Sequence, residues 1–206
     1  MIQMAENRTD RRIRRTIRML RHALAQLIGE KGFDAITISD LTGTADINRT
    51  TFYLHYRDKY DLLNKCEEKI LSDIESISHA SLKCTSKSDL EHDLREGKPV
   101  PFLVELLTYC KENADIIKAL LGPRGDLTFH RQLKKIMEKN LMLRLKEEGT
   151  GNKVIPYDYI AAYVISADLG LVQFWLENGM HEDPETIALM ISEITFRGPA
   201  FAAGYQ

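Results

Sequence analysis

The sequence predicts an all-α protein of about nine helices. Apolar residues recur every three or four positions through most of the 206 residues, as they do along one face of an α-helix. Capping residues precede the periodic segments, and glycine or proline follows them. Apolar and polar residues do not alternate over the length of a strand anywhere in the sequence.

The first predicted helix has an apolar stripe on one face and arginines on the others. Thr9 or Asp10 can cap its start, and Gly32 ends it. The arginines concentrate in its first half, with seven of them between Arg8 and Arg21. The stripe consists of Ile13, Ile17, Leu20, Leu24, Leu27 and Ile28.

Charge is unevenly distributed along the chain. The formal net charge of −2 combines +4 over residues 1–65 with −6 over the remainder. A basic end on an acidic body indicates contact with a polyanion. Two alternatives stay open: a solvated helix face, and an arginine-rich mitochondrial transit peptide. The run continues without a break into a helical unit, which weighs against a transit peptide.

Two short helices and a long one follow. Thr37 and Asp40 form a capping-box pattern for a helix that ends near Ala45. Asn48 can cap a second helix that runs to about Tyr56, and Asp58 can cap a long third helix.

Most of the remaining sequence is predicted to be helical. Residues 81–101 are polar and irregular and predict a loop. Glycines and prolines then separate five more helices, expected over about 101–111, 113–121, 126–148, 156–178 and 184–196.

Two short helices joined by a tight turn after a longer helix form a helix-turn-helix layout. The second helix would present polar side chains that donate hydrogen bonds to phosphates or base edges. A generic helix pair of an α-protein has the same layout. The residues concerned are Arg49, Thr50, Thr51, Tyr53 and His55.

The segment Gly32–Leu63 closely resembles the DNA-binding domain of the tetracycline-repressor (TetR/AcrR) family. Its Asn48–Tyr53 part is similar to a branch found in Gram-positive bacteria. Asp46 stands where the family usually has a turn glycine, and aspartate tolerates a left-handed backbone better than most residues. The matching residues are Phe33, Thr37, Ala45, Tyr53, His55, Tyr56, Lys59, Leu62 and Leu63.

The resemblance implies a three-helix DNA-binding domain over residues 1–60 and a helical effector-binding and dimerisation domain over 61–206. It implies that Arg49, Thr50 and Thr51 read base edges. It also implies that Tyr53, His55 and Lys59 contact backbone phosphates. Thr37 and Ser39, at the start of the preceding helix, would hold another phosphate. The complete predicted DNA-binding set is Thr37, Ser39, Asn48, Arg49, Thr50, Thr51, Tyr53, His55 and Lys59.

The segment Tyr159–Leu176 is apolar nearly all round, so a helix there needs neighbours on two sides. A core helix would satisfy this, and so would a homodimer interface formed with Pro184–Phe196, which the resemblance also implies. Several residues of the C-terminal part are candidates for lining an effector site, although residues of this kind also fill cores. They are Tyr109, Cys110, Phe129, Met137, Tyr163, Phe174 and Trp175.

The cysteines and the absence of catalytic or metal-binding patterns exclude several classes of protein. Three widely spaced cysteines predict no disulfide framework and fit a reducing cytoplasm. We expect no membrane span, because the most apolar run, Val154–Leu176, is interrupted by Asp158 and Asp168. We expect no metal site, cofactor or enzymatic activity, because no catalytic cluster, phosphate loop or metal-ligand spacing stands out. The sequence therefore predicts a homodimeric repressor that binds a palindromic operator and is released by a small-molecule effector. The alternatives are an activator or coactivator controlled by a protein partner, and an enzyme subunit.

Overall fold

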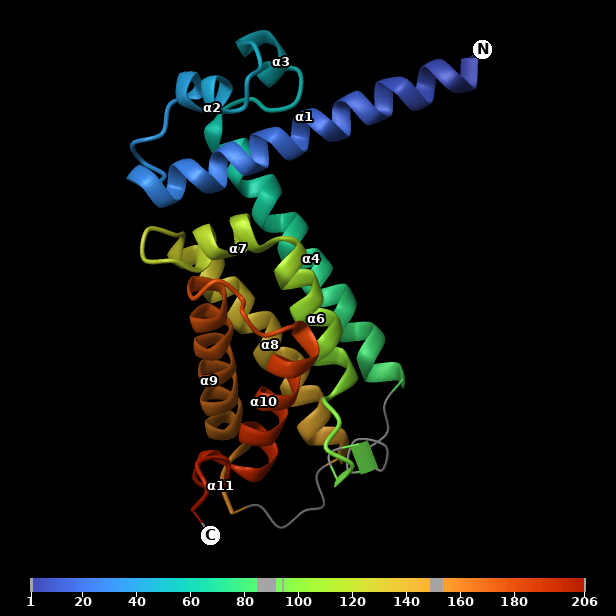
Figure 1. Ribbon diagram of the computed structural model, residues 1–206, viewed down its shortest axis with the longest axis vertical. Coiled ribbons are helices and arrows are strands. Elements are labelled where there is room, and N and C mark those ends of the chain that lie inside the picture. The colour runs from blue at the N-terminus through green and yellow to red at the C-terminus, as the bar shows by residue number, and fades with distance from the viewer. Residues whose placement is uncertain (1, 85–91, 94, 149–153, 206) are drawn as a thin grey trace. The chain divides into compact units, whose positions relative to one another are not determined.

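The computed structural model describes residues 2–84, 92, 93, 95–148 and 154–205, with side chains from residue 11 onward except at 81–84, 147 and 148. Over these residues it contains ten α-helices and no strand, so the predicted all-α fold is confirmed (Figure 1). The chain divides into two compact units. The first unit is Met1–Ile70 with Asp115–Phe129, and the second is Leu71–Ala114 with His130–Gln206.

The first unit contains α1 (Ile2–Lys31), α2 (Ile38–Thr44), α3 (Arg49–Tyr53), the first part of α4 (Lys59–Cys84) and most of α7 (Ala114–Leu121). Each helix turns its apolar stripe toward one core, and α2 and α3 lie on one side of α1 (Figure 1). The largest fully buried aliphatic and aromatic side chains of this core are Leu20, Leu24, Ile28, Ile36, Leu41, Phe52, Leu62, Ile70, Ile117 and Phe129.

Helix α1 begins earlier than the sequence predicted. Its first residue is Ile2, so neither Thr9 nor Asp10 caps it. Residues 2–9 contain no glycine or proline, and nothing in them stops the helix from continuing toward the N-terminus. Its other end lies as expected, because Gly32 has φ +77°, a left-handed conformation that ends a helix.

The second unit contains the rest of α4, α6 (Pro101–Glu112), most of α8 (Leu127–Glu148), α9 (Tyr157–Glu177), α10 (Pro184–Arg197) and α11 (Pro199–Ala202). Helix α10 contacts α6 and α9, and it runs beside α9 in Figure 1. A buried hydrogen bond from the Val100 backbone N–H to Ser192 Oγ, 3.1 Å long, joins the start of α6 to α10. Asp183 caps α10 by accepting from the Thr186 N–H at 2.8 Å.

Most other predicted helix limits agree with the structure, and the remaining differences concern α3, α4 and α11. Helix α3 ends at Tyr53 instead of Tyr56, because the chain must turn to bring Tyr56 into the core and begin α4. Helix α11 was not predicted, since four residues are too few for a periodic pattern. The loop expected over 81–101 is partly wrong: α4 continues to Cys84, and residues 92, 93 and 95 are helical, because this polar stretch has no proline before position 99 to end a helix. Residues 85–91 and 94 of the expected loop lie outside the described residues.

Helix α9 is apolar well beyond what its unit buries. Among the described residues it is the helix long and apolar enough to cross a membrane, with a mean hydropathy of 1.4 over its most apolar window. Core helices of soluble proteins meet the same criterion. Only 22% of that window is buried, and within the described residues Tyr159, Tyr163 and Phe174 leave an exposed apolar stripe on this helix.

Candidate DNA interface

The start of α2 is held by a capping box. The Thr37 backbone N–H and hydroxyl donate to Asp40 Oδ2 at 2.8 and 2.7 Å, and the Asp40 N–H donates to the Thr37 hydroxyl at 3.2 Å. Lys31, at the end of α1, lies 2.7 Å from the same carboxylate. Hydrogen bonding to Lys31 and then to Thr37 holds the pKa of Asp40 well below its usual range. The Thr37 donors therefore point to Asp40, while the Ser39 side chain stays exposed.

A tight turn brings α3 against α2. Asp46 adopts φ +50° in this turn, the left-handed conformation that the usual glycine would supply. The Ile47 N–H donates to the Thr42 carbonyl at 3.0 Å, which ties the turn to α2. Asn48 then caps α3 by accepting from the Thr51 N–H at 2.9 Å. The predicted Asn48 side chain is thus engaged in capping the helix that carries the other candidates.

Helix α3 buries one face and exposes the other. Phe52 is fully buried, and its ring centroid lies 5.6 Å from that of Tyr53 in an edge-to-face contact. Tyr53 is 52% exposed, and Arg49 and Thr50 are exposed while Thr51 is half-buried. The packing of Phe52 therefore orients a short row of donors toward solvent.

Two further predicted residues follow α3. His55 is half-buried, and its carbonyl accepts from Lys65 Nζ at 3.2 Å. Lys59 Nζ donates to three carbonyls of the segment before α2: those of Phe33 at 3.2 Å, Asp34 at 2.8 Å and Ile36 at 2.9 Å. An ammonium has three hydrogens, so these bonds use every donor of Lys59. The structure thus places Lys59 as a clamp between α4 and the loop that leads into α2.

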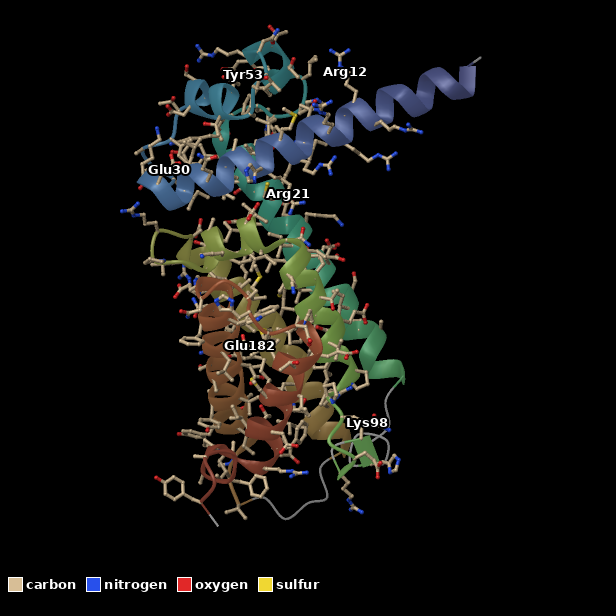
Figure 2. The ribbon with its side chains drawn as sticks, in the orientation of Figure 1. Arg12, Arg21, Glu30, Tyr53, Lys98 and Glu182 are labelled. Carbon is tan, nitrogen blue, oxygen red and sulfur yellow. The ribbon has the colours of Figure 1, made fainter. Side chains whose placement is uncertain are left out.

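The arginines of α1 extend the positive surface. Their side chains are exposed at five positions along the helix. Figure 2 shows Arg12 extending from α1 toward the side of the unit on which α3 and Tyr53 lie. Exposed guanidinium groups on α1 suit contact with the phosphate backbone of a duplex. The five are Arg11, Arg12, Arg14, Arg15 and Arg18.

Sequence reasoning missed how α7 and the turn after it attach to α1. Arg124 Nη1 donates to the carbonyls of Gly29 and Glu30 at 2.7 and 2.5 Å, which satisfies the open C-terminal end of α1. His22 Nδ1 lies 2.9 Å from Asp115 Oδ2. No pattern in the sequence links positions 95 residues apart, so only the folded chain reveals these contacts.

The seven candidate effector residues are not gathered in one place. Phe129 belongs to the first unit and is fully buried. In the second unit Cys110 and Trp175 are buried, and Tyr109 and Met137 are half-buried. The Tyr109 hydroxyl donates to Asp73 at 2.9 Å. Tyr163 and Phe174 are 58% and 66% exposed.

The exposed pair lies on α9, and α10, which contacts α9, also exposes large apolar side chains. Tyr159, Tyr163 and Phe174 of α9 are 72%, 58% and 66% exposed, and Met190 and Phe196 of α10 are 46% and 51% exposed. On α9 these residues recur at helical spacing, so they form one stripe. We call this surface the α9–α10 face.

Comparison with known proteins agrees with this geometry. Residues 20–66 match the family described as bacterial regulatory proteins, tetR family, and residues 98–197 match the transcriptional regulator C-terminal region of the same family. The chain belongs to the TetR family. The two matches together cover most of the sequence, and the first includes all of α2 and α3.

Individual relatives support the TetR assignment. The chain is 28% identical over 184 residues to the HTH-type transcriptional regulator YxbF of Bacillus subtilis, a match that covers 89% of this chain and 45% of YxbF. The chain thus spans about half the length of that relative.

Two solved structures show the same fold. The fatty acid degradation regulator FadR of Bacillus halodurans has a TM-score of 0.63 at 15% identity, covering 89% of this chain and 96% of FadR. A TetR regulator of Streptococcus agalactiae has a TM-score of 0.55 at 25% identity, covering 91% and 97%.

Proposed function

We propose that the chain is a cytoplasmic, homodimeric transcriptional repressor that binds a palindromic DNA operator through α2 and α3. The observation that carries this proposal is α3 itself: a helix capped by Asn48, anchored by Phe52, and exposing Arg49, Thr50 and Tyr53 in a family of DNA-binding regulators. A recognition helix of this kind enters the major groove and reads base edges with its N-terminal residues.

The residues divide into base-reading and phosphate-binding roles. Arg49, Thr50 and Thr51 lie in the first turn of α3, where a side chain reaches base edges. Tyr53, His55, Ser39 and the α1 arginines would hold phosphates. For Thr37, Asn48 and Lys59 we propose positioning roles, because their polar groups already hold α2, α3 and the loop before α2.

The α9–α10 face supports a dimer formed by Tyr159–Leu176 and Pro184–Phe196. Monomeric soluble proteins rarely expose a contiguous apolar patch as large as two helix faces would make. A second copy of the chain offers a matching surface, and a two-fold dimer would place two α3 helices on a palindrome.

A small-molecule effector would act by preferring a dimer state that does not fit the operator. We propose residues 1–60 as the DNA-binding domain and 61–206 as the effector-binding and dimerisation domain. The bonds from Arg124 to Gly29 and Glu30 support a route between them, because α7 and its following turn fall within residues 61–206 and yet belong to the same compact unit as α1.

Selection of genomic fragments by the purified protein at near-physiological salt tests the proposal. We expect recovery of a palindromic site whose two halves lie about one helical turn apart. Arg49→Ala should bind that site more weakly. Recovery of no palindrome, together with equal DNA binding by wild type and Arg49→Ala, would refute the proposed function.

A further inference from the structure

Asn140 is the polar side chain of the second unit that the described fold leaves unsatisfied. The residue is 8% exposed, and neither its amide nitrogen nor its carbonyl oxygen has a hydrogen-bond partner among the described residues. Buried amides are nearly always hydrogen-bonded, because burial removes them from water without replacing its hydrogen bonds. This position therefore requires an explanation.

The register of α8 places Asn140 on its inward face. Leu133 is 4% exposed, Met137 is half-buried, and Asn140 and Arg144 follow at helical spacing. The spacing calls for an apolar residue at position 140, and a carboxamide stands there instead. Simple core packing would be served better by leucine.

Three helices of the second unit surround this part of α8. Lys134 Nζ donates to Ser166 Oγ of α9 at 3.2 Å, and Lys139 Nζ donates to Glu75 Oε1 of α4 at 3.4 Å. Arg144 lies 5.9 Å from the centre of the Phe102 ring of α6. Asn140 thus lies on a helix whose side chains reach α4, α6 and α9, and three candidate effector residues (Tyr109, Cys110 and Met137) lie on α6 and α8.

We propose that Asn140 is the polar anchor of the effector site, and that the effector is a neutral, mainly apolar molecule bearing a primary amide or a lactam, whose N–H and C=O lie on one edge. A carboxamide needs an acceptor for its N–H groups and a donor for its carbonyl. A second amide supplies both in one planar pair of hydrogen bonds. A charged ligand would lose its hydration here without gaining an opposite charge at Asn140.

The proposal rests on the proposed function and adds the chemistry of the effector to it. Its distinctive consequence is that Asn140 costs stability in the protein without ligand. Leucine has the same branching and number of side-chain heavy atoms as asparagine and no polar group. Asn140→Leu should therefore raise the melting temperature of the ligand-free protein by about 2–8 °C, whereas an asparagine that stabilises the fold would give a fall.

The test combines thermal melting with two probes, octanamide and benzamide, and their N,N-dimethyl analogues, which lack N–H donors. We expect at least one primary amide at millimolar concentration to raise the melting temperature of the wild type by at least about 2 °C. Its dimethyl analogue should give a smaller shift, and neither should shift Asn140→Leu. The matched control Leu133→Met, a volume-conserving change on the same helix face, should respond like the wild type.

Operator binding separates this inference from the proposed function. Without probe, wild type and Asn140→Leu should bind the operator equally, and the stabilising amide should weaken binding by the wild type alone, by about 5-fold or more. Any of three outcomes would overturn the inference without affecting the proposed function. The first is a lower melting temperature for Asn140→Leu than for the wild type. The others are equal amide-induced melting shifts in both proteins, and equal shifts with the amide and its dimethyl analogue. Loss of operator binding by the wild type itself would refute the proposed function instead.

Discussion

Replacing Lys59 with methionine distinguishes a structural clamp from a phosphate ligand. Methionine keeps the length and apolar stem of lysine and removes the ammonium group. The resemblance to TetR proteins predicts a phosphate contact at this position, but all three ammonium donors bond to the carbonyls of Phe33, Asp34 and Ile36. We expect Lys59→Met to act mainly on folding stability.

The size of the effect follows from these three bonds. A hydrogen bond from a charged donor contributes about 1.5–3 kcal/mol, and water can replace the donor at the most exposed carbonyl, that of Asp34. The free energy of unfolding should therefore fall by about 2–4 kcal/mol, less than the three contributions added together. For a chain of this size the melting temperature should fall by about 5–15 °C.

The salt dependence of DNA binding decides between the two roles. A residue that neutralises one phosphate contributes about 0.9 to the slope of log K against log salt. We expect Lys59→Met to weaken operator binding without changing that slope, because the loop before α2 is displaced and no phosphate contact is lost. Lys98→Met is the matched control: Lys98 is exposed in the second unit, so stability, affinity and slope should stay at wild-type values.

The opposite pattern would refute this reasoning. If Lys59→Met melts like the wild type and its salt slope falls by about one, the ammonium leaves the three carbonyls in the complex and binds a phosphate. The hydrogen bonds to Phe33, Asp34 and Ile36 would then have little energetic weight.

Three further predictions concern other parts of the chain. Arg49→Ala should lose about 1–3 kcal/mol of operator binding and relax specificity at one base pair per half-site, as measured with a set of single-base operator variants. Glu67→Gln should alter the pH dependence of folding stability. Burial, with a smaller effect of Asp126, raises the pKa of Glu67 from 4.5 to about 7. Between these two pH values the folded chain therefore keeps a proton that the unfolded chain loses. The stability that this group contributes is thus complete below pH 4.5 and lost as the pH rises to 7, and urea unfolding at pH 8 should show Glu67→Gln more stable by about 1–3 kcal/mol, with little difference at pH 4. Gly170→Glu should convert the dimer to a folded monomer, because a Cβ at Gly170 meets no atom within 4 Å in its own chain. Circular dichroism checks that the helix content is unchanged. Light scattering that shows an intact dimer would contradict the proposed interface.

Local patterns were sufficient for most of the secondary structure. The caps Thr37, Asn48 and Asp183 mark the starts of α2, α3 and α10, since a short polar side chain before an apolar run bonds the open N–H groups of the same helix. Gly32 likewise marks the end of α1. These signals act over a few residues, which is why sequence alone carries them.

The candidate site was predictable in type but not in detail. The ordered motif of Gly32–Leu63 indicated which residues belong to the DNA interface, and the structure exposes Arg49, Thr50 and Tyr53 on α3. It also turned the Lys59 ammonium toward the carbonyls of Phe33 and Ile36, which come within reach only when the loop before α2 packs against α4. The Thr37 hydroxyl instead bonds to Asp40 in the local capping box that the sequence predicts.

The sequence by itself determined the all-α class, the helix-turn-helix and the TetR resemblance, because each depends on residue type and short spacing. Only the tertiary structure decided that Arg124 satisfies the carbonyls of Gly29 and Glu30. It alone decided also that, within the part of the chain that the structure describes, the α9–α10 face is exposed and Asn140 is buried without a hydrogen-bond partner. These features depend on which side chains meet across long separations and how much water reaches them. The free energies of hydrogen bonding and burial are set by that three-dimensional neighbourhood, which no local spacing encodes.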